Sequence, residues 1–159
     1  MQVVDFETSS GADDTSISTS NSQTWTDTNV KKTITTTVNN SDIYILGSLH
    51  VYLVNHSVND WNAVNIRLQR IIGGSATTIW TSGTGQYGEF EGYWYGRYTE
   101  NDNAREMNAS PYTYFDTGLT ASAGTSVEYK LEFATKNSYQ ANLSTAYGKS
   151  RMTLMEVMP

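Results

Sequence analysis

The segment DIYILGSLHVYLV, residues 42–54, decides the fold class of this chain. Its side chains alternate in character, and in an extended strand every second residue falls on the same face. One face is aliphatic and the other carries tyrosine, serine and histidine, which is typical of a strand half-buried in an antiparallel sheet. The residues expected to point inward are Ile43, Ile45, Leu49, Val51 and Leu53, and those expected to point outward are Tyr44, Ser48, His50 and Tyr52.

Five further segments have strand patterns, and no long segment has the helical period. NAVNIRLQRII and VEYKLEFAT alternate with a period of two, whereas RMTLMEVM is nearly apolar on both faces, as expected of a central strand packed on two sides. About eight strands with turn residues between them predict an all-β, two-sheet antiparallel sandwich, and the long connections favour a jelly roll. The segments are 31–38, 62–72, 76–81, 127–135 and 151–158, with a turn at Gly73-Gly74 and with Val64, Ile66, Leu68, Val127, Tyr129, Leu131 and Phe133 inward.

Residues 1–30 are polar and rich in serine and threonine, in contrast to the rest of the chain. Such a composition does not bury enough apolar area to offset its ordering entropy, so this segment is expected to lie against something larger. It is either an extended N-terminal arm or, around Val3 and Phe6, an edge strand of the same domain. We therefore expect an arm or edge strand at 1–30 and the sandwich at 31–159, with Val3, Phe6 and Trp25 as candidate protein-contact residues.

Charge and composition exclude several classes of function. The net charge is −6 and the ten basic residues are scattered, so the chain lacks the clustered lysines and arginines that a grip on nucleic acid requires. No apolar run approaches the ~18 residues of a membrane span, and the N-terminal residues do not resemble a signal peptide. There are no cysteines, which excludes a disulfide scaffold and a catalytic thiol.

The segment GEFEGYWYGRY, residues 88–98, contains three glycines four residues apart with five aromatic residues among them. In a strand, Phe90, Trp94 and the glycines would share one face, where glycine leaves room for rings from a facing sheet, and this face is expected to be core. The other face carries Tyr93, Tyr95 and Arg97, residue types that dominate protein interfaces. We predict a contact surface for another protein on that face.

A glycan is the alternative ligand for this region. Nine of the 19 aromatic residues lie between residues 87 and 115, separated by a predicted loop at 100–110 and accompanied by acidic and amide side chains. Aromatic rings beside hydrogen-bonding groups can stack on sugars. The candidate glycan-binding residues are Tyr93, Tyr95, Arg97, Tyr112 and Tyr114.

Catalytic and metal-binding patterns are missing from the sequence. The two histidines, His50 and His56, are isolated, and a metal site requires several converging ligands. The oxygen-rich run at 100–103 lacks the spacing of a calcium loop, and the neighbouring carboxylates Glu89 and Glu91 have no other mark of an acid–base pair. We predict no catalytic residues, no metal, no cofactor and no enzymatic activity.

The chain's last residues, GKSRMTLMEVMP, resemble the closing strand of jelly-roll structural proteins in marine bacteriophage virions. The matching positions are those of a Ser-Arg-x-Thr-Leu-Met-Glu sequence, and VEYKLEFAT is similar to the penultimate strand of those proteins. The resemblance covers roughly the last 35 residues. The matched residues are Ser150, Arg151, Thr153, Leu154, Met155 and Glu156.

The resemblance implies a virion structural protein on the capsid exterior, made in the host cytoplasm. Such a protein would be a head decoration (cement) or head-fibre subunit, often a homotrimer, whose partners are the major capsid protein or other virion proteins. The alternative is a tail-fibre module that recognises a host surface glycan through the aromatic cluster at 87–115. Neither function involves nucleic acid or a membrane.

Overall fold

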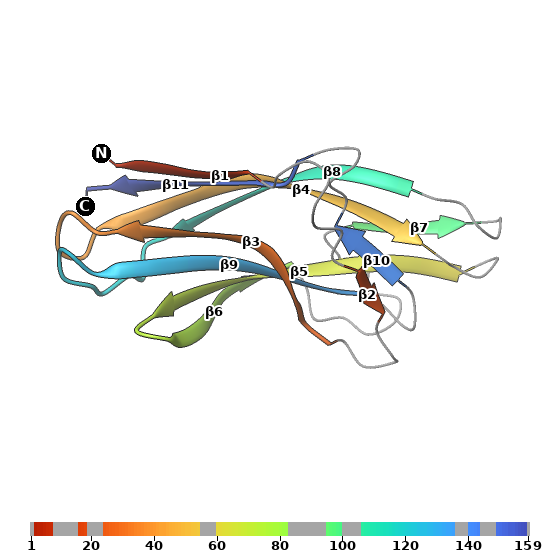
Figure 1. Ribbon diagram of the computed structural model, residues 1–159, viewed down its shortest axis with the longest axis horizontal. Helices are drawn as coiled ribbons and strands as arrows, with labels where there is room; N and C mark the ends of the chain where they lie inside the picture. Colours follow the sequence, from red (N-terminus) through yellow and green to blue (C-terminus); the bar gives the residue numbers. More distant parts are fainter. Residues whose placement is uncertain are drawn as a thin grey trace.

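The fold is all-β, with two antiparallel sheets packed face to face in a computed structural model (Figure 1). The described part of the chain contains no helix long and apolar enough to cross a membrane. The structure describes residues 2–7, 16–18, 24–54, 60–82, 95–99, 106–135, 140–143 and 149–158.

The first sheet is built on β4, whose two edges take different partners. On one edge β4 pairs with β8 along nearly its whole length. On the other edge it pairs first with β11 and then with β10, which lie one after the other. β1 and β2 in turn pair with β11 and β10. The strands are β1 Val3–Glu7, β2 Ser16–Ser18, β4 Asp42–Val54, β8 Glu106–Asp116, β10 Gln140–Leu143 and β11 Arg151–Val157.

The second sheet has the same plan. β5 pairs with β9 on one edge, and β6 and β7 follow one another along its other edge. β3 pairs with the free edge of β9. The strands are β3 Thr26–Thr35, β5 Asp60–Ile72, β6 Ser75–Thr81, β7 Tyr95–Thr99 and β9 Ser126–Thr135.

The strand order confirms the jelly roll. In three places two short strands lie end to end and together occupy one position in a sheet. These pairs are β1 with β2, β6 with β7, and β10 with β11, and with each pair counted once every sheet is four positions wide. Numbered in chain order, these positions run 1-8-3-6 in the first sheet and 2-7-4-5 in the second. This interleaving of the two halves of the chain is the arrangement of a two-sheet jelly roll.

Burial confirms the inward residues predicted for β4, β5 and β9, apart from Leu53, whose side chain lies outside the described residues. The residues between them in β4, such as Tyr44 and His50, are only half-buried, whereas Asn65 and Gln69 of β5 and Glu132 of β9 are buried on the opposite face. β3, β8 and β11 complete the core from both sheets. The largest fully buried side chains are Tyr129, Phe133, Ile34, Ile43, Ile45, Leu49, Ile66, Leu68, Leu131 and Met152.

The structure corrects the prediction for residues 100–110. Residues 106–110 were expected in a loop, but they form the first half of β8 because they pair with β4, as in the register of His50 with Ala109. Pairing with a long apolar strand overrides the polar composition of this segment. Pro111 is tolerated because β8 is the outermost described strand of its sheet.

The prediction that both faces of β11 are packed is wrong. β11 does lie between β1 and β4, and Met152 and Leu154 are buried on its inner face. On its outer face, Met155 is only half-buried and Val157 is 37% exposed. The apolar outer face of β11 is therefore partly open, which bears on the interaction surface described below.

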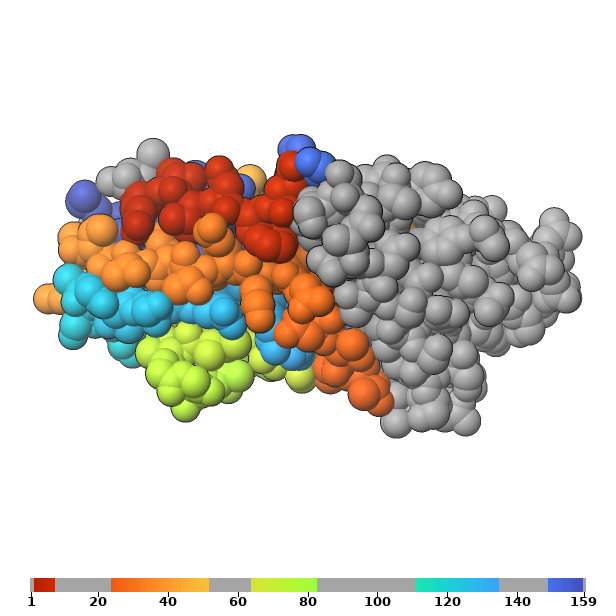
Figure 2. All heavy atoms as spheres, viewed as in Figure 1, coloured from red at the N-terminus to blue at the C-terminus, as the bar shows by residue number. Residues whose placement is uncertain are grey.

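The N-terminal residues contribute to both sheets. β1 pairs with β11 as an edge strand, and Figure 2 shows its atoms lying against those of β3 along one side of the sandwich. The boundary expected at residue 30 falls inside β3, which begins at Thr26. A β-bulge between Asp27 and Lys31 accommodates Asn29, whose φ is 59°, and the backbone N–H of Asn29 donates to the Asp27 carboxylate at 2.7 Å.

The turn predicted at Gly73-Gly74 is confirmed and depends on glycine. The φ angles are 56° at Gly73 and 82° at Gly74, in the left-handed region that two-residue hairpin turns of type I′ require at both positions. No atom lies within 4 Å of a Cβ built on either residue, so an added methyl would meet backbone strain but no clash.

Gly74→Ala is expected to lower the free energy of unfolding by about 1 kcal/mol because alanine resists a positive φ. Gly74→Asn is the matched control, because asparagine tolerates this region and a smaller loss is expected. Urea denaturation of the two variants measures the difference. Equal losses for alanine and asparagine would contradict a turn limited by φ.

Candidate interaction surface

The predicted contact face at 88–98 lies largely outside the described residues. Tyr93 is among the residues that are not described, and the structure gives only the backbone of Tyr95 and Arg97, in β7. β7 pairs with β5, where Tyr95 is opposite Val64 and Arg97 is opposite Asn62. A contact role for Tyr93, Tyr95 and Arg97 stays a prediction.

The structure places the other two glycan candidates on the core side of β8. Tyr112 is 5% exposed and its hydroxyl donates to the Arg151 carbonyl at 2.8 Å, while Tyr114 is half-buried against the core. Burial also raises the pKa of the Tyr112 phenol. Tyr112 therefore offers no open ring face for stacking on a sugar, and its role is packing between the sheets.

Trp25 is already engaged within the chain. The guanidinium carbon of Arg67 lies 4.8 Å from the centroid of the Trp25 ring, in a cation–π contact. Arg67 also pairs with Glu132, and Lys130 pairs with both Glu132 and Asp27 on the same outer face of the second sheet. The hydrogen bond to Glu132 raises the pKa of the Lys130 ammonium. Trp25 is half-buried, and Arg67 lies over its ring, which leaves less of the ring for an outside partner.

Val3 and Phe6 lie on opposite faces of β1. Phe6 is half-buried against the core together with Val4, whereas Val3 points outward and is 45% exposed. Of the predicted apolar contact residues in β1, Val3 is the one open to a partner.

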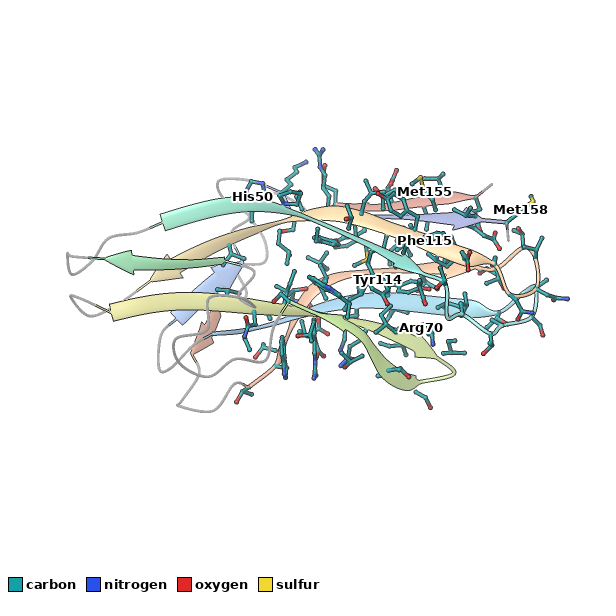
Figure 3. All side chains as sticks on the ribbon, turned by 180° about the vertical axis from the view of Figure 1, so that it is seen from behind. His50, Arg70, Tyr114, Phe115, Met155 and Met158 are labelled. Carbon is teal, nitrogen blue, oxygen red and sulfur yellow. The ribbon has the colours of Figure 1, made fainter. Side chains whose placement is uncertain are left out.

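Val3 is one end of an apolar row that crosses the whole outer face of the first sheet. The backbone register places Val3 opposite Met155, Met155 opposite Tyr44, and Tyr44 opposite Phe115. Tyr44 and Phe115 meet edge to face, with ring centroids 6.1 Å apart and an interplanar angle of 69°. Figure 3 shows Phe115 and Met155 on the same layer, at the end of the molecule where Met158 also lies.

The remaining exposed apolar side chains lie beside this row. Among the described residues, the large hydrophobic side chains classed as exposed are Val3, Phe115, Val157 and Met158, at 45%, 45%, 37% and 62%. The first three lie on the outer face of the first sheet and Met158 follows β11 directly. Concentration of exposed apolar surface on one face is typical of an interaction site.

Residues 150–156, on which the expected resemblance to phage virion proteins rests, form β11 up to Glu156 and the residue before it. The backbone N–H of His50 donates to Ser150 Oγ at 3.0 Å, and Arg151 and Lys149 pair with Glu7 of β1. Leu154 is fully buried. Ser150 therefore contacts β4, while Arg151 contacts β1 through its side chain and β8 through its backbone carbonyl.

Glu156 is a buried carboxylate that anchors the 36–41 turn to β11. It is 1% exposed and accepts hydrogen bonds from the Thr37 backbone N–H at 2.6 Å, the Thr37 hydroxyl at 2.7 Å and the Val38 N–H at 3.3 Å. Burial alone would raise its pKa, but these hydrogen bonds outweigh burial and hold the pKa of the Glu156 carboxyl below its ordinary value. The ionised form is therefore the one that the fold stabilises.

Stability is expected to depend on pH through Glu156. Because the pKa is lower folded than unfolded, the stabilisation is complete at neutral pH and is lost as pH falls below about 4.5 through the folded pKa. Glu156→Gln is expected to cost about 2 kcal/mol at pH 7, since a neutral amide replaces a charged acceptor. Urea denaturation at pH 7 and pH 3 measures this, and the wild type should approach the variant in acid.

Glu128→Gln is the matched control, because Glu128 is a half-buried carboxyl in β9. We expect this change to alter stability by less than about 0.5 kcal/mol at either pH. An undiminished difference between the wild type and Glu156→Gln at pH 3 would contradict a role for the ionised carboxylate.

A second buried carboxylate, Asp116, joins the two sheets. Arg70 of β5 donates to both its oxygens, at 2.9 and 3.0 Å, and the Tyr129 hydroxyl of β9 donates at 2.8 Å. Asp116 itself ends β8 in the first sheet and is 2% exposed. Burial, followed by the nearby Asp116 charge, raises the pKa of the Tyr129 phenol, so that Tyr129 remains a hydrogen-bond donor.

Comparison with known proteins gives fold neighbours and no family. No protein-family model matches the chain, and no curated protein matches it. The structure of infectious bursal disease virus, Gt strain, is 15% identical with a TM-score of 0.47. The match covers 99% of this chain and 38% of the viral chain.

Two further structures give similar values. A VP2 subviral particle of the same virus is 16% identical with a TM-score of 0.43, over 99% of this chain and 38% of its own. T=1 particles derived from that virus are 14% identical with a TM-score of 0.40, over 99% and 36%. The chain thus spans less than two fifths of the length of these neighbours.

No metal-binding group is present in the described part of the chain. Among those residues, no three or more histidine, cysteine, aspartate or glutamate side chains are placed to hold a metal ion. His50 lies on the outer face of β4, while His56 and the oxygen-rich run at 100–103 fall outside the described residues.

Proposed function

We propose that this chain is a non-enzymatic structural protein of a phage virion, a capsid decoration or head-fibre subunit. It binds the capsid surface, through the major capsid protein or another virion protein, and it binds copies of itself as a homotrimer. Its place is the exterior of the capsid, after synthesis in the host cytoplasm.

The observation that carries the proposal is the position of the segment that resembles phage virion proteins. That segment is β11, at the centre of the first sheet, where Glu156 holds the 36–41 turn and Arg151 holds both β1 and the Tyr112 hydroxyl. A match at residues with such specific contacts supports a shared jelly-roll core.

The glycan-binding alternative has less support from the described residues. Tyr112 and Tyr114, two of its five candidate residues, lie on the core side of β8. The open apolar surface lies instead on the outer face of the first sheet, where Val3 and Phe115 are exposed. That surface favours a protein partner over a sugar, because it presents apolar side chains with few polar groups to bind hydroxyls.

Rebinding to particles tests the proposal. Purified chain is mixed with phage particles assembled without it, and the particles are sedimented through sucrose. We expect the chain to sediment with the particles to a saturating level, and excess unlabelled chain to displace a labelled sample. A chain that stays in the supernatant at all concentrations, yet is retained on a glycan array, would contradict the proposal and favour host recognition.

A further inference from the structure

The open apolar row on the first sheet has the features of a contact between copies of this chain. It contains one residue from each of the four strand positions, namely Val3 of β1, Met155 of β11, Tyr44 of β4 and Phe115 of β8. Each is exposed or half-buried. Cross-strand pairs such as Tyr44 and Phe115 stabilise the monomer only modestly and leave the row open to water, whereas an apolar stripe that reaches both edges can be covered by another sheet.

Charge favours a second copy over a strongly charged partner. The described charged side chains on this face and at its border are three acids, Asp5, Glu7 and Asp42, and two bases, Lys149 and Arg151, so the net charge is −1. The whole chain carries −6. Two copies that meet through this face therefore bring together little of the charge that would otherwise make them repel.

The bases on this face already form ion pairs within the chain. Glu7 accepts from Lys149 and from Arg151 in an ion-pair cluster at the polar end of the face, and these contacts lower the pKa of Glu7, the Lys149 hydrogen bond most. A partner chosen by charge complementarity would find few unpaired charges among the described residues. An apolar partner surface fits this face better than a charged one does. A second copy of the chain has such an apolar surface.

The size of the face sets the strength of the contact. Four strand positions about 4.8 Å apart, along the seven residues of β11 at about 3.3 Å each, give an area of roughly 450 Å². A pair of copies would bury roughly 900 Å², below the ~1,200 Å² of stable complexes and in the range of weak ones. Many such contacts within one assembly would act together, so a weak contact between two copies is sufficient to hold them in the assembly.

We infer that the outer face of the first sheet is a self-association surface, on which the row Val3–Met155–Tyr44–Phe115 of one copy packs against the same row of a second copy. A contact that uses the same patch on both copies is isologous, with a two-fold axis near the middle of the row, so it joins copies from two neighbouring trimers and is separate from the three-fold contact of the proposed homotrimer. Met155 lies at one of the two central positions, so the Met155 side chains of the two copies come close together. This inference rests on the proposed function, because it requires that copies of the chain be neighbours in a particle.

Disulfide trapping tests the contact. The chain has no cysteine, so in the variant Met155→Cys any disulfide must join two copies. Val3→Cys provides a second probe at an exposed position, and Thr35→Cys, on an exposed residue of β3 in the second sheet, is the control. After mild oxidation at equal concentration, we expect at least tenfold more covalent dimer from Met155→Cys than from the control on a non-reducing gel.

A charge placed in the row provides the second half of the test. Phe115→Asp, introduced into the Met155→Cys variant, is expected to reduce the trapped dimer to the level of the control, while urea denaturation shows that the sandwich is still folded. Equal trapping in the row variants and the control would overturn the inference, as would trapping that Phe115→Asp leaves unchanged.

Failure of this inference is distinguishable from failure of the proposed function. A wild-type chain that rebinds particles, with row cysteines that do not cross-link, would leave a virion role in place and assign the apolar face to another virion protein. Cross-linking through the row by a chain that does not bind particles would support self-association and contradict the virion role.

Discussion

Gly47→Ala is expected to lower the free energy of unfolding by about 3–5 kcal/mol. A Cβ at Gly47 would lie 2.0 Å from the Arg151 carbonyl oxygen and 2.4 Å from the Tyr112 hydroxyl oxygen. The Tyr112 side chain crosses β4 above this glycine to reach β11. The methyl would force the strands apart and break the buried hydrogen bond, which combines about 1–3 kcal/mol of overpacking with about 1–3 kcal/mol for unpaired polar groups.

Gly118→Ala is the matched control for Gly47→Ala. A Cβ at Gly118 would have only ordinary contacts, at 3.7 Å from an Asp116 carboxylate oxygen and 3.9 Å from Arg70. We expect a change below about 1 kcal/mol there. Urea denaturation followed by far-ultraviolet circular dichroism compares the variants. A Gly47→Ala variant as stable as the control would mean that Tyr112 does not cross β4 at this point.

Asp116→Ala is expected to cost about 3–5 kcal/mol, because it leaves Arg70 without its buried partner. Asp116 is 2% exposed, and the Arg70 side chain is 17% exposed, so neither charge is well hydrated in the fold. Removing one member of a buried ion pair leaves the other uncompensated, which is among the larger effects of single substitutions. The Tyr129 hydroxyl also loses its acceptor.

A double variant separates loss of charge pairing from loss of packing. Arg70→Met with Asp116→Leu removes both charges while keeping apolar volume, and we expect it to recover more than half of the stability lost in Asp116→Ala. Asp42→Ala, a half-buried acid on the outer face of β4, is the control. If Asp116→Ala and Asp42→Ala had equally small effects, the cluster would not join the two sheets energetically.

The periodicity of the sequence predicts the long strands well. In β4, β5 and β9 the described residues on the core side are buried, because each strand has one face on the core, and a period of two is read from one segment alone. Asn65, Gln69 and Glu132 are also buried on the opposite face, which their polar side chains do not predict. The polar first half of β8 has no such signal. It is a strand because β4 pairs with it, and pairing between segments about 60 residues apart leaves no mark in local composition.

Several contacts that hold the sandwich together could not be predicted from the sequence pattern. Gly47 interrupts an apolar strand, and a glycine in such a place signals a close approach, although only the register shows that Tyr112 is what approaches. Glu156 lies in a run that was expected to be apolar on both faces, yet it is buried and satisfied by backbone N–H groups from a turn about 120 residues earlier. The hydrogen-bond partners of Glu156 can be identified only once the fold is known.

The interaction surface required the register of four strands. Val3 was identified from the sequence, but Met155 and Tyr44 looked like ordinary strand residues, and Phe115 was grouped with Tyr112 and Tyr114 in one aromatic cluster. The alternation of β8 separates them, since Phe115 is 45% exposed while Tyr112 is buried. Only the cross-strand register aligns Val3 and Phe115 in a single row from opposite edges of the sheet.

The most direct test of the virion role is the protein content of purified particles. Virus particles are purified by density gradient from cells that produce this chain during infection, and they are analysed by quantitative mass spectrometry. We predict that the chain is recovered with the particles at a constant ratio to the major capsid protein across gradient fractions and preparations. A chain that is abundant in infected cells but absent from purified particles would contradict the account.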